Sequence, residues 1–342
     1  MVLLNFRDAF LYHEDVQLFH GSGWLNEACI NFAFRVLEAD YEVLLARAGA
    51  GAGSNAAPTS DVVHLMDPSV VSWVHFQLEE GEESADFVRD SSLLHKPWLL
   101  LPVNDASSLL ESGSHWSLLA LDVRNMGSTS TSTGGTGRGG RGGTVGAGGV
   151  RGYHFDPMSG HNEAAAASVF AAITRALDCG RAAATVTTTV AASAASTASA
   201  ASAAGASASG HMLWHMGALC PQQADGHSCG VYVVLFADYL AKLVLSESSA
   251  AASDASATAA EDSATAAAAT AAASDGGLDA YCAGESGGDC SGSSKGVKCG
   301  WKASTDTHWL RGMRQAVTPS SAARFRADIV VEVETLCAAV KK

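Results

Sequence analysis

The residue types needed for nucleophilic catalysis occur at the ends of three predicted elements. Cys229, in PQQADGHSCGVYVV, stands where a loop meets a long apolar helix, and the positive end of a helix dipole favours a thiolate there. His115 begins one predicted strand, and Asp156 ends another. A thiol nucleophile needs a base, and the base needs an acceptor that fixes its tautomer. Together these residues indicate a cysteine activated by a histidine–aspartate pair.

Each of these residues also has a purely structural interpretation. Cys229 fits a small buried side chain, and His115 fits a core histidine. Asp156 fits a turn residue before Pro157. Gln223, six residues before Cys229, fits either a polar loop residue or a donor that stabilises an oxyanion together with the Cys229 backbone N–H. Taken singly, the residues leave these alternatives open.

Hydrophobic periodicity predicts the elements that must position these side chains. Asp67 before Pro68 is typical of a helix N-terminus, and Pro319 fits the turn before a last helix. Residues 230–245 are apolar on most faces, which predicts a central buried helix. Mixed helices and strands in this order predict an α+β domain. The other predicted elements are helices at 24–39, 67–78 and 325–340 and strands at 98–103, 114–123, 153–156 and 212–216.

Much of the 342-residue chain is low-complexity sequence. Only 16% of residues are charged, against about 25% in a typical globular domain. Ala, Ser, Gly and Thr bury too little apolar area to offset chain entropy. We therefore expect one domain, residues 1–342, interrupted by disordered surface insertions whose alanine-rich parts are transiently helical. The insertions are predicted at about 46–58, 125–150, 184–210 and 246–304.

Composition argues against several classes of function. The formal net charge of −14 disfavours nucleic acid as a partner, because phosphates need a basic surface. The longest apolar stretch, 231–245, contains Asp238 and Lys242 and is too short for a membrane span. The start of the chain lacks the pattern of a signal peptide, so we expect the eight cysteines to stay reduced.

Four potential metal ligands lie in one Gly/Ser-rich stretch. They are Cys282, Cys290, Cys299 and His308. Zinc ligands usually come as cysteine pairs two to four residues apart, and these spacings are wider and irregular. The pattern favours free thiols over a metal site.

The order of the catalytic motifs resembles the Ulp1/sentrin-specific family of cysteine proteases, which cleave ubiquitin-like modifiers. The shared order is His–Trp at 115–116, then Asp156, then Gln223 followed by Cys229 and glycine; papain-like enzymes place the cysteine first. WLN at 24–26 and LPVND at 101–105 are also similar to family elements. The likeness is greatest to the deneddylase branch, because the portion before WLN is short, HWSLL matches, and TPSSAARFRADIVVEVETL resembles its Thr-Pro turn and closing helix.

The resemblance implies a fold and a set of roles. The fold is an α+β, Ulp1-like member of the papain-like superfamily in permuted order, with a central mixed sheet packed by helices and the nucleophile at the N-terminus of a buried helix. Cys229 is then the nucleophile, His115 its base, Asp156 the residue that orients His115, and Gln223 the oxyanion donor. The implied substrate-binding residues are Trp24, Asn26, Glu27 and Trp116.

The two tryptophans would close a tunnel over a Gly-Gly tail, because such a tunnel admits glycine and clashes with any Cβ. Trp24 fits equally well as an aromatic anchor of the helix start. Three positions depart from the family pattern: Ser228 and Glu27 stand where aspartate is usual, and Pro157 follows the catalytic aspartate where serine is common. These departures bear on the choice of modifier, since every triad member is present.

The resemblance therefore implies a cysteine-type isopeptidase and endopeptidase that cleaves after the terminal Gly-Gly of a ubiquitin-like modifier, in deneddylation and precursor processing. It implies no cofactor and no metal, and partners that include the neddylation modifier and conjugates such as neddylated cullins. The alternatives are a SUMO-specific protease with the same triad, a catalytically silent modifier-binding protein, and an acyltransferase on the same scaffold. We expect a monomer in the cytoplasm, the nucleus or both.

Overall fold

The structure is a computed structural model that describes residues 2–49, 62–79, 81–126, 148–193, 210–248 and 308–340. By their internal contacts the residues form two units. The first consists of Met1–Lys242 and His308–Lys342, and the second is Leu243–Thr307. Within the second unit only residues 243–248 are described. All the described strands belong to the first unit.

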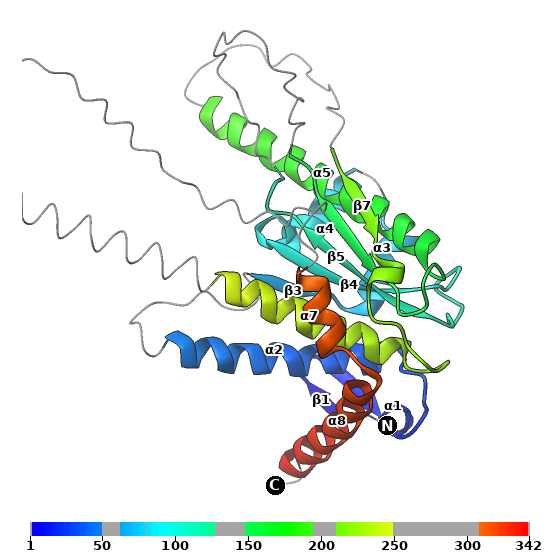
Figure 1. Cartoon of the computed structure of the whole chain (residues 1–342). Helices are drawn as coiled ribbons and strands as arrows, with labels where there is room; N and C mark the ends of the chain where they lie inside the picture. Colours follow the sequence, from blue (N-terminus) through cyan, green and yellow to red (C-terminus); the bar gives the residue numbers. More distant parts are fainter. Residues whose placement is uncertain are drawn as a thin grey trace, which may run out of the picture. The chain divides into compact units, whose positions relative to one another are not determined.

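Helices and strands are interspersed along the described chain (Figure 1). The strands are β1 (Val2–Phe6), β2 (Ala9–Tyr12), β3 (Val63–Leu65), β4 (Trp98–Asn104), β5 (Trp116–Asp122), β6 (Arg151–Phe155) and β7 (Met212–His215). The helices are α1 (His13–Phe19), α2 (Glu27–Gly49), α3 (Pro68–Phe76), α4 (Glu82–Asp90), α5 (Glu163–Ser193), α7 (His308–Ala316), α8 (Pro319–Val340) and a helix over Cys229–Ser248 that we call the Cys229 helix. Two 3-10 turns, η2 (Leu93–His95) and η3 (Gly217–Leu219), are also present in the part of the chain that the structure describes.

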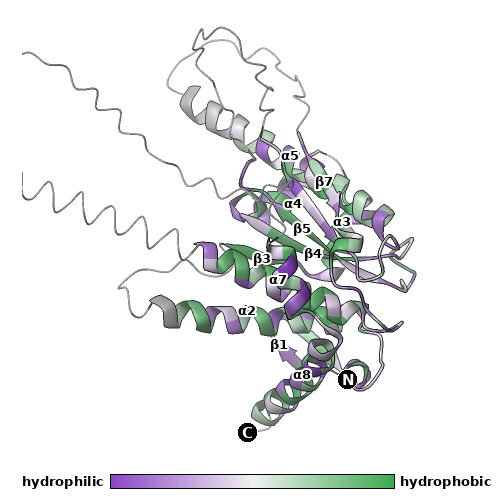
Figure 2. Cartoon of the chain, in the orientation of Figure 1, coloured by the Kyte–Doolittle hydropathy of each residue, from purple (hydrophilic) through white to green (hydrophobic). Residues whose placement is uncertain are grey.

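Five strands form the central sheet, in the order β3-β4-β5-β6-β7. β3 is parallel to β4 and β7 is parallel to β6, whereas β5 is antiparallel to both of its neighbours. β4 and β5 are buried along almost their whole length, and both are predominantly hydrophobic in Figure 2. β1 and β2 form a separate two-stranded sheet. The mixed sheet with helices confirms the predicted α+β class.

Different helices cover the two faces of the central sheet. Alternate residues of β4 and β5, such as Leu101 and Leu119, join one hydrophobic core with α3, α4 and α5. Gly152 lets α5 approach this face, because a Cβ there would lie 2.7 Å from the Phe170 ring. On the other face of the sheet, Phe155 of β6 packs against the Cys229 helix. Its ring centroid lies 6.0 Å from that of Phe236. The period of two in the strands thus buries both faces.

Most predicted elements are present with shifted ends. The four predicted strands correspond to β4, β5, β6 and β7, and Asp67 caps α3 by accepting from Ser69 N at 2.7 Å. The helix predicted at 24–39 begins only at Glu27, so that WLN is a loop. The last helix begins at Pro319 rather than 325. Thr318 and Ser321 cap each other there, which makes the proline the first helical residue instead of a turn residue.

The predicted insertions are too long at their edges. α2 continues to Gly49, α5 continues to Ser193, and the Cys229 helix continues to Ser248. Alanine has the highest helix propensity, so helices that begin in the core propagate into the alanine-rich sequence. Val150 is buried, and its carbonyl accepts from Met212 N. The remainder of each predicted insertion lies outside the described residues.

The Cys229 helix is long and apolar enough to cross a membrane by length and composition alone. However, 67% of its most apolar window is buried inside the protein. A core helix of a folded domain has the same composition, and its packing against β6 accounts for the apolar residues.

Candidate active site

His115 and Asp156 meet because their strands are antiparallel neighbours. His115 immediately precedes β5, Asp156 immediately follows β6, and Leu118 pairs with Phe155 in the register. The start of one strand therefore lies beside the end of the other. His115 Nε2 and Asp156 Oδ1 are 2.7 Å apart, and both side chains are buried. The structure thus brings together the predicted base and the acceptor predicted to orient it.

Two backbone N–H groups also hold the Asp156 carboxylate. Met158 N donates to Oδ1 and Asn162 N donates to Oδ2, each at 2.9 Å. Burial acts to raise the pKa of Asp156, but the hydrogen bonds from His115 and from these two N–H groups outweigh it and lower the pKa. Asp156 is therefore ionised at neutral pH and can hold an imidazolium.

The second ring nitrogen of His115 is left for Cys229. Nε2 is committed to Asp156, and Nδ1 is buried without another hydrogen-bond partner. Burial lowers the pKa of His115, but hydrogen bonds to Asp156 and Cys229, and the charges of both, raise it to about 9. The ring is therefore protonated near neutral pH. An imidazolium in this position stabilises a thiolate at the cysteine.

Cys229 is the first residue of its helix, as the sequence predicts. Ser228 occupies the N-cap position, since its carbonyl accepts from Tyr232 N. Asp225 organises the loop before it. Asp225 Oδ1 accepts from the backbone N–H groups of His227 and Ser228 at 2.9 and 2.8 Å, and Oδ2 accepts from Ser228 Oγ at 2.9 Å. The loop therefore fixes Cys229, which is 3% exposed, at the positive end of the helix.

Gln223 lies on the same loop, with its amide turned toward Asp225. Nε2 donates to the Asp225 carbonyl at 2.6 Å, and the role of Gln223 as an oxyanion donor stays a prediction. The Cys229 N–H is the other predicted donor. The preceding residue, Gln222, has a structural role, because its Nε2 donates to the Asp156 carbonyl at 3.0 Å.

Trp116 and Trp24 lie in different environments. Trp116 is 6% exposed, and its indole Nε1 donates to the Leu25 carbonyl at 3.0 Å. The Leu25 side chain is buried beside Gly230, where an added Cβ would lie 3.0 Å from Leu25 Cβ. Trp24, next to Leu25, is 49% exposed. Trp116 therefore fixes the WLN segment through Leu25. Trp24, the residue before Leu25, remains accessible.

Asn26 and Glu27 already have partners within the protein. Asn26 Oδ1 accepts from Cys29 N at 3.0 Å, and its Nδ2 donates to Asp15 Oδ1 at 2.7 Å. Asn26 is thus the cap of α2, a structural role that the motif comparison did not indicate. The Glu27 carboxylate accepts from two serine hydroxyls of α3, each at 3.3 Å. Contact of either residue with a substrate stays a prediction.

Comparison with known proteins places this geometry in a family. The family model described as the Ulp1 protease family, C-terminal catalytic domain, matches residues 76–268, more than half of the chain. That range includes His115, Asp156, Gln223 and Cys229. The chain belongs to the Ulp1 protease family.

Individual relatives agree with the family assignment. Sentrin-specific protease 8 of Rattus norvegicus is 31% identical over 118 residues, which are 34% of this chain and 48% of that protein. NEDD8-specific protease 1 of Arabidopsis thaliana is 29% identical over 119 residues, which are 34% and 45%. The chain spans about half the length of the curated relatives it matches. A solved structure of SUMO protease Ulp1, with its catalytic cysteine oxidised to a sulfenic acid, aligns with a TM-score of 0.38 at 14% identity over 70% of this chain and 77% of that chain.

Within the described residues, this Ulp1-family chain has no group of three or more His, Cys, Asp or Glu side chains placed to hold a metal ion. Cys282, Cys290 and Cys299 lie outside those residues, and of His308 only the backbone is described, at the start of α7. The expectation of free thiols there stays a prediction.

Sequence reasoning missed several residues that support the site. Asp105 Oδ1 accepts from Ser114 N and His115 N at 2.6 and 2.8 Å, which fixes the entry to β5. Asp225 does the same for the loop before Cys229. Asp225 binds N–H groups two and three residues on, which is a common turn device, whereas Asp105 binds N–H groups nine and ten residues on. The sequence therefore carried a local signal for Asp225 but not for Asp105, and none for the place of either residue beside the triad.

Proposed function

We propose that this chain is a thiol isopeptidase and endopeptidase that cleaves after the terminal Gly-Gly of a ubiquitin-like modifier. The observation that carries the proposal is the buried arrangement of Cys229, His115 and Asp156, with 2.7 Å between His115 Nε2 and Asp156 Oδ1. A thiolate beside an oriented imidazolium is suited to attack a carbonyl carbon. The complete set of reacting groups argues against a catalytically silent binder.

Restricted access to the thiol supports a glycine tail as the substrate segment. Cys229 is 3% exposed and His115 is buried, so a bound chain segment must be narrow. Glycine lacks a Cβ and fits where other residues clash. Trp24 is 49% exposed next to a segment that Trp116 fixes, which supports its accessibility to such a tail.

The reaction then follows from the groups in place. Cys229 Sγ attacks the carbonyl carbon after Gly-Gly, and the oxygen takes up negative charge that the Cys229 N–H and the Gln223 amide stabilise. Collapse of this intermediate breaks the C–N bond, and the leaving amine takes a proton from His115. Water that has lost a proton to His115 hydrolyses the thioester and frees the thiol. No metal or organic cofactor is required by these steps.

The modifier we propose is the neddylation modifier, NEDD8. Support comes from the motif likeness to the deneddylase branch and from a relative whose name is NEDD8-specific protease 1. The substrates are then the NEDD8 precursor and conjugates such as neddylated cullins, and the enzyme acts as a monomer in the cytoplasm, the nucleus or both. Glu27 stands where the family usually has an aspartate that contacts the modifier. Because this position differs, a SUMO-specific protease is the second candidate.

The test uses NEDD8, SUMO and ubiquitin, each with a C-terminal vinyl sulfone that traps a reactive cysteine. Each probe is mixed with the wild-type chain and with Cys229→Ala, and intact masses are measured. We expect an adduct with NEDD8 that the variant does not form. An adduct with SUMO alone would retain the chemistry and overturn the modifier. Binding of a modifier without any adduct would overturn the proposed activity and favour the silent binder.

A further inference from the structure

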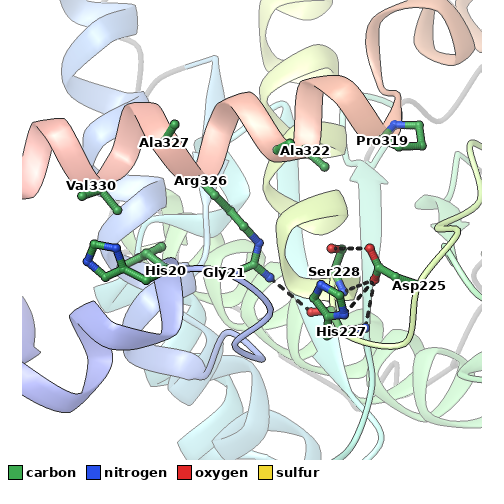
Figure 3. Close-up of a pocket in the computed structure, with 12 residues that line it drawn as sticks. His20, Gly21, Asp225, His227, Ser228, Pro319, Ala322, Arg326, Ala327 and Val330 are labelled. Atoms are coloured by element: carbon green, nitrogen blue, oxygen red, sulfur yellow. Dashed lines mark hydrogen bonds and ion pairs between the residues drawn. The ribbon is translucent and has the colours of Figure 1, made fainter.

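Arg326, on the C-terminal helix α8, reaches the loop that carries the nucleophile. It lies outside the residues matched by the family model, and it is 7% exposed. Its guanidinium donates to the carbonyls of Leu18 and Gly23 at 2.8 Å each and to that of His227 at 3.3 Å. Figure 3 shows Arg326 extending from α8 toward His227, in the wall of a pocket of about 530 Å³. One side chain therefore joins α8 to two other segments, residues 18–23 and the loop at His227.

Two of the three acceptors depend on a close backbone approach. A Cβ at Gly23 would lie 2.6 Å from Leu18 O and 2.7 Å from Leu18 Cα, so a side chain there would push the backbone at Gly23 away from Leu18. Glycine lets both carbonyls approach the same guanidinium. A planar group with five donors is suited to such a set, whereas an ammonium group is not.

Both segments that Arg326 holds lead toward the start of the Cys229 helix. Gly23 lies two residues before Leu25, whose carbonyl is held by Trp116 and whose side chain packs beside Gly230. His227 lies two residues before Cys229 itself. Movement of the Arg326 side chain would therefore be transmitted to both sides of the helix N-terminus that presents the thiol.

The guanidinium of Arg326 also interacts electrostatically with several nearby groups. Burial lowers the pKa of Arg326, while the charges of Asp225, Cys29 and Cys229 act to raise it, and an arginine stays protonated under such conditions. Burial raises the pKa of Cys29 to about 12, so that this thiol is neutral. Asp225 is then a negative group near the guanidinium, and His20 and His227 line the same pocket.

We propose that Arg326 is a positioning residue for Cys229, which fixes the loop before the nucleophile and favours its thiolate with a buried positive charge. This role rests on the proposed function, because it assigns Arg326 to the same reacting thiol. The alternative is a purely structural tie between α8 and the rest of the domain.

The experiment measures alkylation of Cys229 by iodoacetamide, a small reagent that needs no modifier. The full-length wild type, Arg326→Met and Arg326→Lys are compared, and the Cys229 peptide is quantified by mass spectrometry at pH 6 and pH 9.5. The matched control is Arg324→Met, which removes an exposed arginine of the same helix that pairs only with Asp328 at 3.4 Å among the described residues. Tm is measured for every variant.

In Arg326→Met we expect the ratio of the alkylation rate at pH 6 to that at pH 9.5 to fall by about tenfold, because a nearby buried charge has been removed. In Arg326→Lys we expect the ratio to stay near the wild-type value, while kcat for modifier cleavage falls because a lysine cannot hold three carbonyls. Arg324→Met should match the wild type in both measurements.

A lower Tm in Arg326→Met with an unchanged rate ratio would overturn the proposal and leave the structural tie. If Arg326→Met does not fold, Arg326→Lys decides, and wild-type kcat in that variant would contradict the positioning role. The outcome is separate from the proposed function. A chain that cleaves no modifier and yet shows the altered rate ratio in Arg326→Met would disprove the protease activity without removing the influence of Arg326 on the thiol.

Discussion

Burial lowers the pKa of His115, but its two hydrogen-bonding partners, Asp156 and Cys229, have the larger effect. They raise the pKa of His115 to about 9. In Cys229→Ala one of these partners is lost, so we expect the pKa of His115 to fall. An NMR titration of the imidazole resonances in the wild type and the variant measures the difference. Identical titration curves would show that the ring does not interact with the thiol.

Asp156 sets both the orientation and the charge of His115. In Asp156→Asn, the carboxylate that accepts from His115 Nε2 is replaced by a neutral amide, so the imidazolium loses its main stabilising partner. We expect kcat for modifier cleavage to fall by about 10³- to 10⁴-fold, as in other triads that lose the orienting carboxylate.

The matched control for that change is Asp122→Asn. Asp122 is also fully buried, but it lies at the opposite end of β5 and pairs with Arg124 at 2.9 Å. Steady-state kinetics and Tm are measured for both variants. An equal loss of kcat in the two would mean that the effect comes from burying an altered side chain rather than from the triad.

The catalytic residues of the site could be predicted from the sequence. Of the contacts that support them, only the local ones could. Cys229, His115 and Asp156 stand at element ends that follow from local apolar patterns. Asp225 acts within three residues of its own position, which a turn motif can indicate. Arg326 binds carbonyls up to 308 positions away in sequence, and no local pattern in a single sequence specifies such a contact.

Among the elements, the two tryptophans at the WLN segment differ in role: Trp116 anchors the segment, and Trp24 is exposed on it. Trp116 is 6% and Trp24 is 49% exposed. We expect Trp116→Ala to destabilise the fold by about 3 to 5 kcal/mol, the usual cost of removing a buried tryptophan. Trp24→Ala should leave the free energy of unfolding nearly unchanged and raise KM for modifier cleavage. Urea unfolding and steady-state kinetics measure the two effects, and an unchanged KM in Trp24→Ala would remove this residue from the tail-binding site.

The elements that sequence patterns predicted best are those buried on both sides. β4, β5 and the Cys229 helix are nearly continuous apolar runs, so their type and place follow from composition. The β1–β2 hairpin was missed, because its turn uses Arg7 and Asp8 at φ 50° and 65° instead of glycine or asparagine. α5 was missed for a different reason: its alanine-rich sequence resembles the low-complexity insertion into which it runs.

For the whole molecule, the triad links stability to pH. The folded pKa of His115, about 9, lies above the ordinary value of 6.5. This group therefore stabilises the fold fully below about pH 6.5, and its contribution is lost as pH rises through about 9. We expect the free energy of unfolding to fall between pH 6 and pH 9.5 by up to about 3 kcal/mol more in the wild type than in His115→Gln. Urea unfolding at both pH values measures this, and equal falls in the two proteins would contradict it.

Shortening the connection between β5 and β6 tests whether its low-complexity sequence contributes to the stability of the fold. Asp122 pairs directly with Arg151, so the sheet already holds the two ends of this connection together. Replacing residues 127–147 by Gly-Gly shortens the loop roughly threefold, and the smaller closure entropy should stabilise the fold by about 1 kcal/mol. We expect the shortened chain to unfold cooperatively and to alkylate at Cys229 at the wild-type rate.

A variant with residues 127–147 in scrambled order keeps the loop length and is the control for that deletion. It should match the wild type in urea unfolding and in the alkylation rate, because loop closure depends on length and not on order. If shortening the loop lowers the free energy of unfolding while scrambling does not, the connection contributes contacts to the fold. If scrambling alone abolishes the reactivity of Cys229, the order of these residues matters to the site, and residues 127–147 are not a neutral insertion.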